Sequence, residues 1–301
     1  MSSNGKNSSL NIAGKIKDYL KLIKVSLSIM VVFSSVLAFL LVPGIEKKYV
    51  NPLQMTILLA IGGLLVTGSA NAINQAVEKN TDAIMKRTAS RPVAAGRMSL
   101  TEAWLFAIIA AVAGVFILGK YFNWTAAGLA ALSLFLYAFI YTPLKKVNAV
   151  AVLVGAFPGA LPCLIGWAAG DETLSIGGWI LFGIQFLWQF PHFWAICWIA
   201  YKDYSLAGFK LLPSEKGPTK FTALQTIIYS LLLLPIGVVP YFIGMSGITS
   251  LFIVAIANLF MVWQCVRLYR EMEIKAARRV MFSSYIYLPV VLFALLGDKL
   301  G

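Results

Sequence analysis

Nine long apolar runs, separated by short polar segments, divide the chain of 301 residues. The runs lie near residues 22–43, 54–77, 102–119, 123–142, 149–168, 176–200, 220–244, 248–266 and 280–297. Each is close to the roughly 20 apolar residues that cross a bilayer, and runs of this length satisfy their backbone hydrogen bonds in lipid as helices. We therefore expect an all-α, polytopic membrane protein. Residues 1–21 are expected to form a cytoplasmic N-terminal segment, and residues 22–297 a single transmembrane domain.

The composition agrees with this fold class and excludes several kinds of protein. Apolar residues make up 59% of the chain and charged residues only 12%, about half the charged fraction of a soluble domain. Such hydrophobicity excludes intrinsic disorder. The single histidine excludes a multi-histidine metal site within this chain, and the three cysteines lie far apart in apolar runs, without metal-ligand or redox spacing.

The net charge of +13 is distributed unevenly between the polar segments. With nine spans these segments alternate between the two sides of the membrane. One side carries 21 basic and 8 acidic residues, and the other carries 4 of each. The positive-inside rule therefore predicts a cytoplasmic N-terminus and an extracytoplasmic C-terminus. Since the whole excess of positive charge faces the cytoplasm, membrane topology and an anionic ligand explain it, and we expect no nucleic-acid partner.

The densest group of oxygen ligands follows the second apolar run. Asn74, Glu78 and Asp82 are spaced four residues apart, so on a helix their side chains share one face. One amide oxygen and two carboxylates are too few for an all-protein calcium site. They suit Mg²⁺, which retains water and takes substrate phosphates as further ligands. We therefore expect a magnesium site at the cytoplasmic edge of the bundle.

Three cations, Lys86, Arg87 and Arg91, come directly after these ligands. Arginine presents a planar fork that matches phosphate oxygens. Pro92 disfavours helical geometry at Arg91, which predicts that the helix ends there and that the loop folds over. Basic residues at a membrane edge also serve simply to orient a protein, but next to three oxygen ligands they favour a binding site for a phosphorylated substrate.

Two further polar groups lie on the cytoplasmic side. Tyr141 and Lys145 close the fourth run at a spacing of four, where an aromatic belt and an anchoring lysine are the ordinary alternatives. In the sixth run, helical geometry places four polar residues in one stripe, provided that the expected kink at Pro191 rotates it little. These are Gln185, Gln189, His192 and Asp203.

His192 is flanked by the aromatic residues Trp188, Phe193 and Trp194. A lone histidine in an apolar run is often only a hydrogen-bonded core residue. The other interpretations are proton transfer and contact with a flat aromatic or metal-bearing ligand. A metal- and phosphate-binding edge above an aromatic interior suits an amphiphile with a diphosphate head and a long apolar tail. A secondary transporter of an anionic solute is the alternative from a different class, although transporters usually bind near the midplane.

The chain resembles the UbiA superfamily of intramembrane prenyltransferases over about residues 15–297. Four stretches carry the resemblance, within residues 74–92, 141–145, 159–169 and 188–213. The sequence Trp-Gln-Phe-Pro-His-Phe at 188–193 is typical of the branch that farnesylates heme. The family often has Lys-Pro-Arg where this chain has Lys24-Val25-Ser26. Of the second Asp-x-x-x-Asp pair common in the superfamily only Asp203 remains, with Ile199 four residues before it.

The resemblance implies a UbiA-type bundle of nine transmembrane helices around a central cavity that opens toward the cytoplasmic loops. It implies transfer of a farnesyl group from farnesyl diphosphate to a vinyl group of heme B, with addition of water, to give heme O for terminal oxidases. Prenylation of another aromatic acceptor is the closest alternative. The implied setting is the bacterial cytoplasmic (inner) membrane, with heme A synthase or terminal-oxidase assembly factors as protein partners.

The resemblance and the spacing together assign roles to thirteen residues. Mg²⁺ is the expected cofactor, and heme B is a substrate. The expected metal ligands are Asn74, Glu78 and Asp82, the further catalytic residues Lys145, His192 and Asp203, and the substrate-binding residues Lys86, Arg87, Arg91, Tyr141, Trp188, Gln189 and Lys202.

Overall fold

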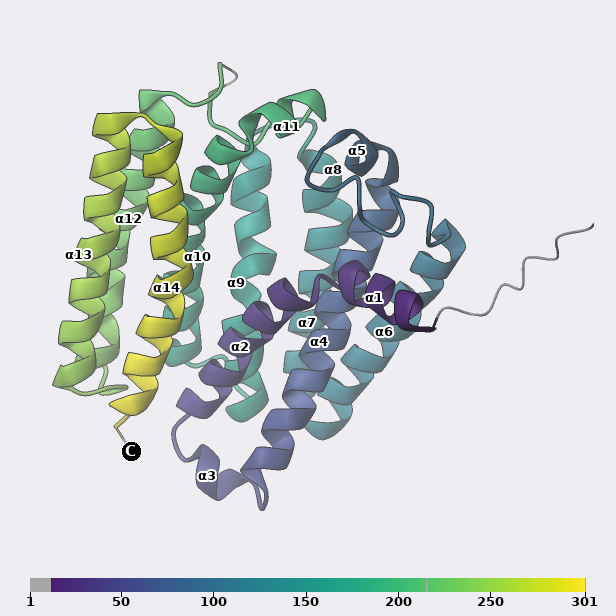
Figure 1. Cartoon of the computed structure of the whole chain (residues 1–301). Helices are drawn as coiled ribbons and strands as arrows, with labels where there is room; N and C mark the ends of the chain where they lie inside the picture. Colours follow the sequence, from purple (N-terminus) through teal and green to yellow (C-terminus); the bar gives the residue numbers. More distant parts are fainter. Residues whose placement is uncertain (1–11, 215, 301) are drawn as a thin grey trace, which may run out of the picture.

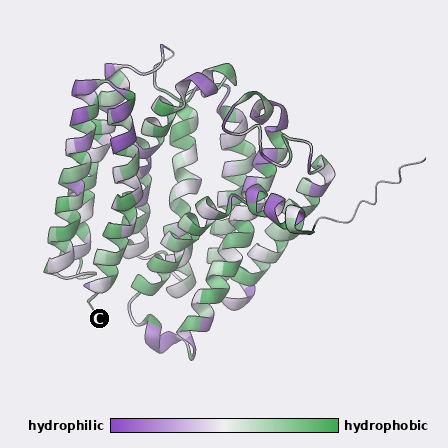
Figure 2. Cartoon of the chain, viewed as in Figure 1, coloured by the Kyte–Doolittle hydropathy of each residue, from purple (hydrophilic) through white to green (hydrophobic). Residues whose placement is uncertain are grey.

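The computed structural model describes residues 12–214 and 216–300. Within these ranges the chain is helical, and the one extended pairing is an isolated bridge between Ser246 and Lys299 (Figure 1). Figure 2 shows that the long helices are largely hydrophobic, whereas hydrophilic residues gather at their ends and in the short connecting helices. The protein is therefore an integral membrane protein built as a bundle of helices.

In the part of the chain that the structure describes, eight helices are long and apolar enough to cross a membrane, and they coincide with the second to ninth predicted runs. The largest difference is at the last run, where the helix begins at Ile274 rather than near residue 280. The spans are α4 (Pro52–Val77), α6 (Leu100–Tyr121), the composite of α7 (Trp124–Phe135), η1 (Leu136–Tyr141) and α8 (Thr142–Leu144), α9 (Val150–Gly170), α10 (Ile176–Ile199), α12 (Lys220–Phe242), α13 (Ile248–Glu271) and α14 (Ile274–Gly297).

The first predicted run differs from the other eight. It corresponds to α2 (Val25–Leu41), which is preceded by α1 (Ile12–Leu22) at a bend of 50°. The count of spans reaches nine only if this bent pair is taken as one. The bend lies at Lys24, whose φ of 48° and ψ of 58° are left-handed, a conformation that is unfavourable for a residue with a side chain.

Short helices mark the two ends of the bundle. Helices α5 (Lys79–Ile84) and α11 (Tyr201–Leu206) lie at one end, and α3 (Ile45–Lys48) and the end of α14 lie at the other (Figure 1). Ion pairs from Lys15 to Glu102 and from Arg97 to Asp18 attach α1 to the start of α6 and to the preceding loop. The residues that the sequence assigns to the site lie toward the end of the bundle with α5 and α11.

Helix α9 is the most buried span, and small residues allow this close packing. A Cβ atom on Gly166 would lie only 1.8 Å from the backbone oxygen of Ser35 in α2. The outer faces show the reverse polarity of a soluble protein, because large apolar side chains such as Phe252 (61% exposed) and Ile256 (67% exposed) point away from the bundle. These faces are suited to contact lipid.

Candidate active site

Asn74, Glu78 and Asp82 lie together at the junction of α4 and α5, as their spacing predicts. Glu78 separates the two helices with φ and ψ of −92° and 13°, but the hydrogen bonds from Glu78 N to Asn74 O (2.9 Å) and from Asp82 N to Glu78 O (2.7 Å) continue across it. All three side chains are buried, and Asp82 is completely inaccessible. The Asn74 amide also donates to Glu78 Oε2 at 2.8 Å. The junction therefore keeps the three oxygen ligands on one side of the chain.

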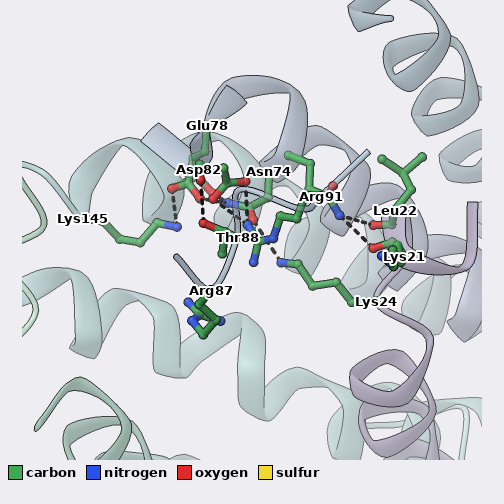
Figure 3. A network of polar contacts seen from close by, with 12 residues as sticks. Lys21, Leu22, Lys24, Asn74, Glu78, Asp82, Arg87, Thr88, Arg91 and Lys145 are labelled. Atoms are coloured by element: carbon green, nitrogen blue, oxygen red, sulfur yellow. Dashed lines mark hydrogen bonds and ion pairs between the residues drawn. The ribbon is translucent and has the colours of Figure 1, made fainter. Parts of the chain in front are cut away.

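Each of these three residues is met by a basic side chain from a different segment (Figure 3). The partners come from the bend between α1 and α2, from the loop after α5, and from the residue after α8. Lys24 Nζ donates to Asn74 Oδ1 at 3.1 Å, Arg91 Nη1 donates to Asp82 Oδ1 and Oδ2 at 2.8 and 2.6 Å, and Lys145 Nζ forms an ion pair with Glu78 Oε1.

The loop that carries Arg91 does not follow the predicted course. Helix α5 ends at Ile84 rather than at Arg91, and residues 85–98 run through successive turns. The Thr88 hydroxyl donates to Asp82 O at 2.9 Å, which occupies a carbonyl that a continuing helix would need. The expectation that the loop folds over is correct, because this early end brings the Arg91 guanidinium back onto the Asp82 carboxylate.

Burial acts against the charged forms of Asp82 and Lys145, two members of the cluster that lie outside the spans. It raises the pKa of the Asp82 carboxyl, an effect opposed by the Arg91 guanidinium. It likewise lowers the pKa of the Lys145 ammonium, and there the Glu78 carboxylate opposes the shift. Buried charges are costly unless they are paired, so a cluster that keeps them at a membrane edge is typical of a functional site.

Lys145 lies in a cage of aromatic rings. Its ammonium is 5.0 Å from the centre of the buried Tyr141 ring and 5.1 Å from that of Phe209. Tyr141 ends a π-helical turn, a distortion that is frequent at functional sites. A pocket of about 420 Å³ lies at the α1–α2 bend and is lined by Lys17, Lys21 and Lys24, of which Lys24 also contacts the cluster.

The remaining predicted cations lie outside this cluster. Arg87 is exposed and donates to the Tyr204 hydroxyl at 3.2 Å, with its guanidinium 5.6 Å from the ring centre. Burial raises the pKa of Tyr204 to about 12. Lys86 and Lys202 are also exposed. Within the described ranges, neither makes a hydrogen bond or ion pair with the three oxygen ligands, so their substrate-binding roles stay predictions.

The predicted polar stripe on α10 is wrong in its extent. Gln185 and Gln189 are buried against α9, where their amides donate to Gly159 O and Ala156 O, both at 2.9 Å. His192 instead meets α14. Asp203 is not on the same helix, because α10 ends at Ile199 and Asp203 belongs to the separate helix α11. The end of α10 therefore divides residues that an uninterrupted helix would align.

Comparison with known proteins identifies the family. The UbiA prenyltransferase family matches residues 28–287. The chain belongs to this family. It is 44% identical to the protoheme IX farnesyltransferase of Cytophaga hutchinsonii, over 96% of this chain and all of that protein. It is 40% identical to the protoheme IX farnesyltransferase of Flavobacterium johnsoniae, over 98% of this chain and 99% of that one.

Solved structures agree with the fold. The structure of a digeranylgeranylglyceryl phosphate synthase superposes with a TM-score of 0.77 at 21% identity, covering 95% of this chain and 98% of that one. A UbiA homologue from Archaeoglobus fulgidus, bound to GPP and Mg²⁺, superposes with a TM-score of 0.65 at 15% identity, covering 93% and 99%. The bundle of helices seen here is therefore the UbiA fold. The family match and the curated relatives identify the chain as a prenyltransferase.

Within this UbiA chain, Lys24 is the residue that the sequence did not assign to the site. It stands where the family often has Lys-Pro-Arg, and this segment departs from that pattern. The structure nevertheless directs the Lys24 ammonium onto Asn74 (Figure 3). A lysine at the start of an apolar run was the available signal, but only the left-handed bend at Lys24 brings it to the cluster.

Proposed function

We propose that this chain transfers the farnesyl group of farnesyl diphosphate to a vinyl group of heme B and that water is added in the same reaction, which gives heme O for terminal oxidases. The observation that carries the proposal is the buried cluster in which three oxygen ligands each meet a basic side chain. The family and the names of its curated relatives agree with this activity. We also propose that the site faces the cytoplasm of the bacterial inner membrane, from the side on which basic residues accumulate.

The donor set suits a magnesium–diphosphate complex. Asn74, Glu78 and Asp82 would hold Mg²⁺, which neutralises diphosphate oxygens when it is bound. These residues supply two carboxylates and one amide oxygen, so substrate and water oxygens must complete the coordination. No group of three or more His, Cys, Asp or Glu side chains able to hold a metal occurs within the described ranges.

The ion pairs define what the basic residues do when the substrate arrives. In the free protein, Lys145 and Arg91 neutralise Glu78 and Asp82. With the carboxylates holding the metal, Lys145 and Arg91 would be available to contact the diphosphate oxygens. Lys24, which contacts the Asn74 amide oxygen, is placed to do the same. This exchange of partners would keep the charges of the two ion pairs compensated before and after substrate binds, as the low dielectric of the site requires.

The reaction then balances as follows. The bond between C1 of the farnesyl group and the diphosphate oxygen breaks, and the leaving group takes the electron pair. Preorganised cations stabilise the charge that develops there. The terminal carbon of a heme vinyl group bonds to the farnesyl C1, which leaves a cation on the vinyl carbon next to the ring. Water adds to that carbon and loses a proton, giving a hydroxyl group.

The proposal is tested by incubating the purified protein in lipid nanodiscs with heme B, farnesyl diphosphate and MgCl₂. We expect heme O, identified by chromatography and mass. Asp82→Asn should abolish product formation, and Glu172→Gln, the same kind of change at an exposed carboxylate paired with Lys48 of α3, is the matched control. Prenylation of 4-hydroxybenzoate but not of heme would instead establish another aromatic acceptor. Uptake of an anionic solute into vesicles without prenyl transfer would establish a transporter. Either result would overturn the proposal.

A further inference from the structure

His192 lies at the contact between α10 and α14, seven residues before the end of α10 and so about 10 Å below it along the helix axis. Its Nδ1 atom is 2.8 Å from the Ser284 hydroxyl oxygen. Its ring stacks on Trp188, with the centres 4.8 Å apart and the planes 16° apart. Tyr285 meets the ring edge-on at 5.2 Å. The imidazole is therefore held in one orientation from several sides.

The hydrogen bonds of Ser284 determine which nitrogen of His192 carries the proton. Ser284 is completely buried, and its hydroxyl donates to Met281 O at 2.6 Å in the preceding turn of α14. The single hydroxyl proton is thus used, and the oxygen can only accept from His192. It follows that Nδ1 of the neutral ring carries the proton and that Nε2 keeps its lone pair.

The environment of Nε2 indicates a ligand rather than a structural contact. Nε2 makes no hydrogen bond to any side chain or backbone atom of residues 12–214 and 216–300, and the ring is only half-buried. Trp188, which stacks on this ring, is itself fixed by a hydrogen bond from its Nε1 to Ser284 O at 2.9 Å. Histidines that bind metals typically donate their second ring N–H to a fixed acceptor, which sets the tautomer and the ring plane. His192 has this arrangement.

We propose that Nε2 of His192 is the axial ligand of the iron of the heme substrate, and that Ser284 and Trp188 are the positioning residues that present it. This inference rests on the proposed function, since it identifies how the acceptor is held during that reaction. Coordination would fix one face of the macrocycle on α10 and so place a vinyl edge in a constant position. Ser284 has no role in the sequence-based assignment, because its contact with His192 joins residues 92 positions apart.

The single histidine of the chain makes the test specific. Protein produced with ¹⁵N-histidine and a histidine-free affinity tag is loaded with ferric heme B in nanodiscs. We expect a ¹⁵N hyperfine coupling to the iron by pulsed EPR and the Soret band of an imidazole-ligated heme. His192→Gly should lose both signals, and added imidazole should restore the Soret band. Ser284→Ala should weaken heme binding about 10- to 100-fold, as changes next to metal ligands do. Ser283→Ala, the neighbouring residue on α14, should leave heme binding unchanged.

Three outcomes separate this inference from the proposed function. If the wild-type protein forms heme O but shows no ¹⁵N coupling, or if His192→Gly keeps the wild-type spectrum, the assignment of the ligand is wrong and the function stands. If the coupling is present but no heme O forms from farnesyl diphosphate, the ligand is correct and the function is wrong. Restoration by imidazole also shows that the glycine variant is folded.

Discussion

Replacing Lys145 by Met should lower both the stability and the activity of the protein, for different reasons. The side chains of Lys145 and Glu78 are only 8% and 7% exposed, so the ion pair is almost fully removed from solvent. Methionine fills much of the same volume but leaves the Glu78 carboxylate buried without its partner. Stranding one member of a buried pair costs about 3–5 kcal/mol. At roughly 2 °C per kcal/mol for a chain of this length, the melting midpoint should fall by about 6–10 °C.

The effect on activity comes from the leaving group. Lys145 is proposed to move from Glu78 to the diphosphate when the substrate binds, and there to stabilise the charge that develops as the farnesyl bond breaks. Loss of one preorganised donor of this kind lowers kcat by about 100- to 1000-fold, or roughly 2.7–4 kcal/mol. Heme O formation is measured by chromatography well below the melting midpoints of all the variants, so that unfolding does not contribute to the rate.

Two further variants separate the effects. Glu78→Gln added to Lys145→Met removes the stranded charge, so the double variant should regain most of the lost melting midpoint and none of the activity. Lys146→Met is the matched control, because Lys146 is exposed and its ammonium donates to the Thr81 hydroxyl, at 2.7 Å, rather than to a carboxylate of the site. It should change neither property by much. A kcat of Lys145→Met within twofold of wild type would refute the role in leaving-group stabilisation. A double variant no more stable than the single one would refute the buried-pair argument.

The remaining predictions concern the loop, the packing and the metal. Arg91→Lys substitutes a point charge for a guanidinium that donates to both carboxylate oxygens of Asp82. Heme O formation should therefore fall about 10- to 100-fold, since hydrogen bonds to charged groups contribute about 1.5–3 kcal/mol. Gly166→Ala places a Cβ atom against Ser35 O and should lower the melting midpoint by several degrees, while Gly128→Ala, which has no atom within 4 Å of the new Cβ, should not. EDTA should abolish turnover and added MgCl₂ should restore it. Mg²⁺ together with a farnesyl diphosphate analogue should raise the melting midpoint, whereas Mg²⁺ alone should have little effect because Lys145 and Arg91 already neutralise the two carboxylates.

The sequence predicted the spans well because hydrophobic length is a local property. Eight of the nine predicted runs coincide with long helices, and the ligands spaced by four residues on α4 and α5 lie together, since local helical geometry determines both. The first run is the exception. The change of direction at Lys24 depends on a left-handed backbone in a residue that normally avoids it, and no apolar pattern encodes that.

The errors occurred where a helix was extended beyond its true end. The stripe on α10 was continued to Asp203 as if no break followed Ile199, and the helix after Glu78 was continued to Arg91. In the second case a side-chain hydrogen bond from Thr88 ends the helix early. Such competition between side chain and backbone is not visible in hydrophobic periodicity. The sequence therefore shows that Arg91 and Lys24 are positively charged, but it does not show which residues they contact.

The ion pairs of the site explain why a strongly basic edge does not disrupt a bundle that must also bury carboxylates. Lys145 approaches Glu78 from a segment that is distant in the sequence, so the folded bundle is needed to assemble that pair, whereas Arg91 reaches Asp82 from the loop that directly follows α5. A rigid metal site with its carboxylates unpaired would leave two buried negative charges uncompensated before substrate arrives. Pairing removes that penalty but makes binding of Mg²⁺ depend on a ligand that takes up the released cations. A diphosphate does so through its own negative oxygens. Metal and substrate should therefore bind together, with a cooperativity that disappears when Lys145 and Arg91 are neutralised.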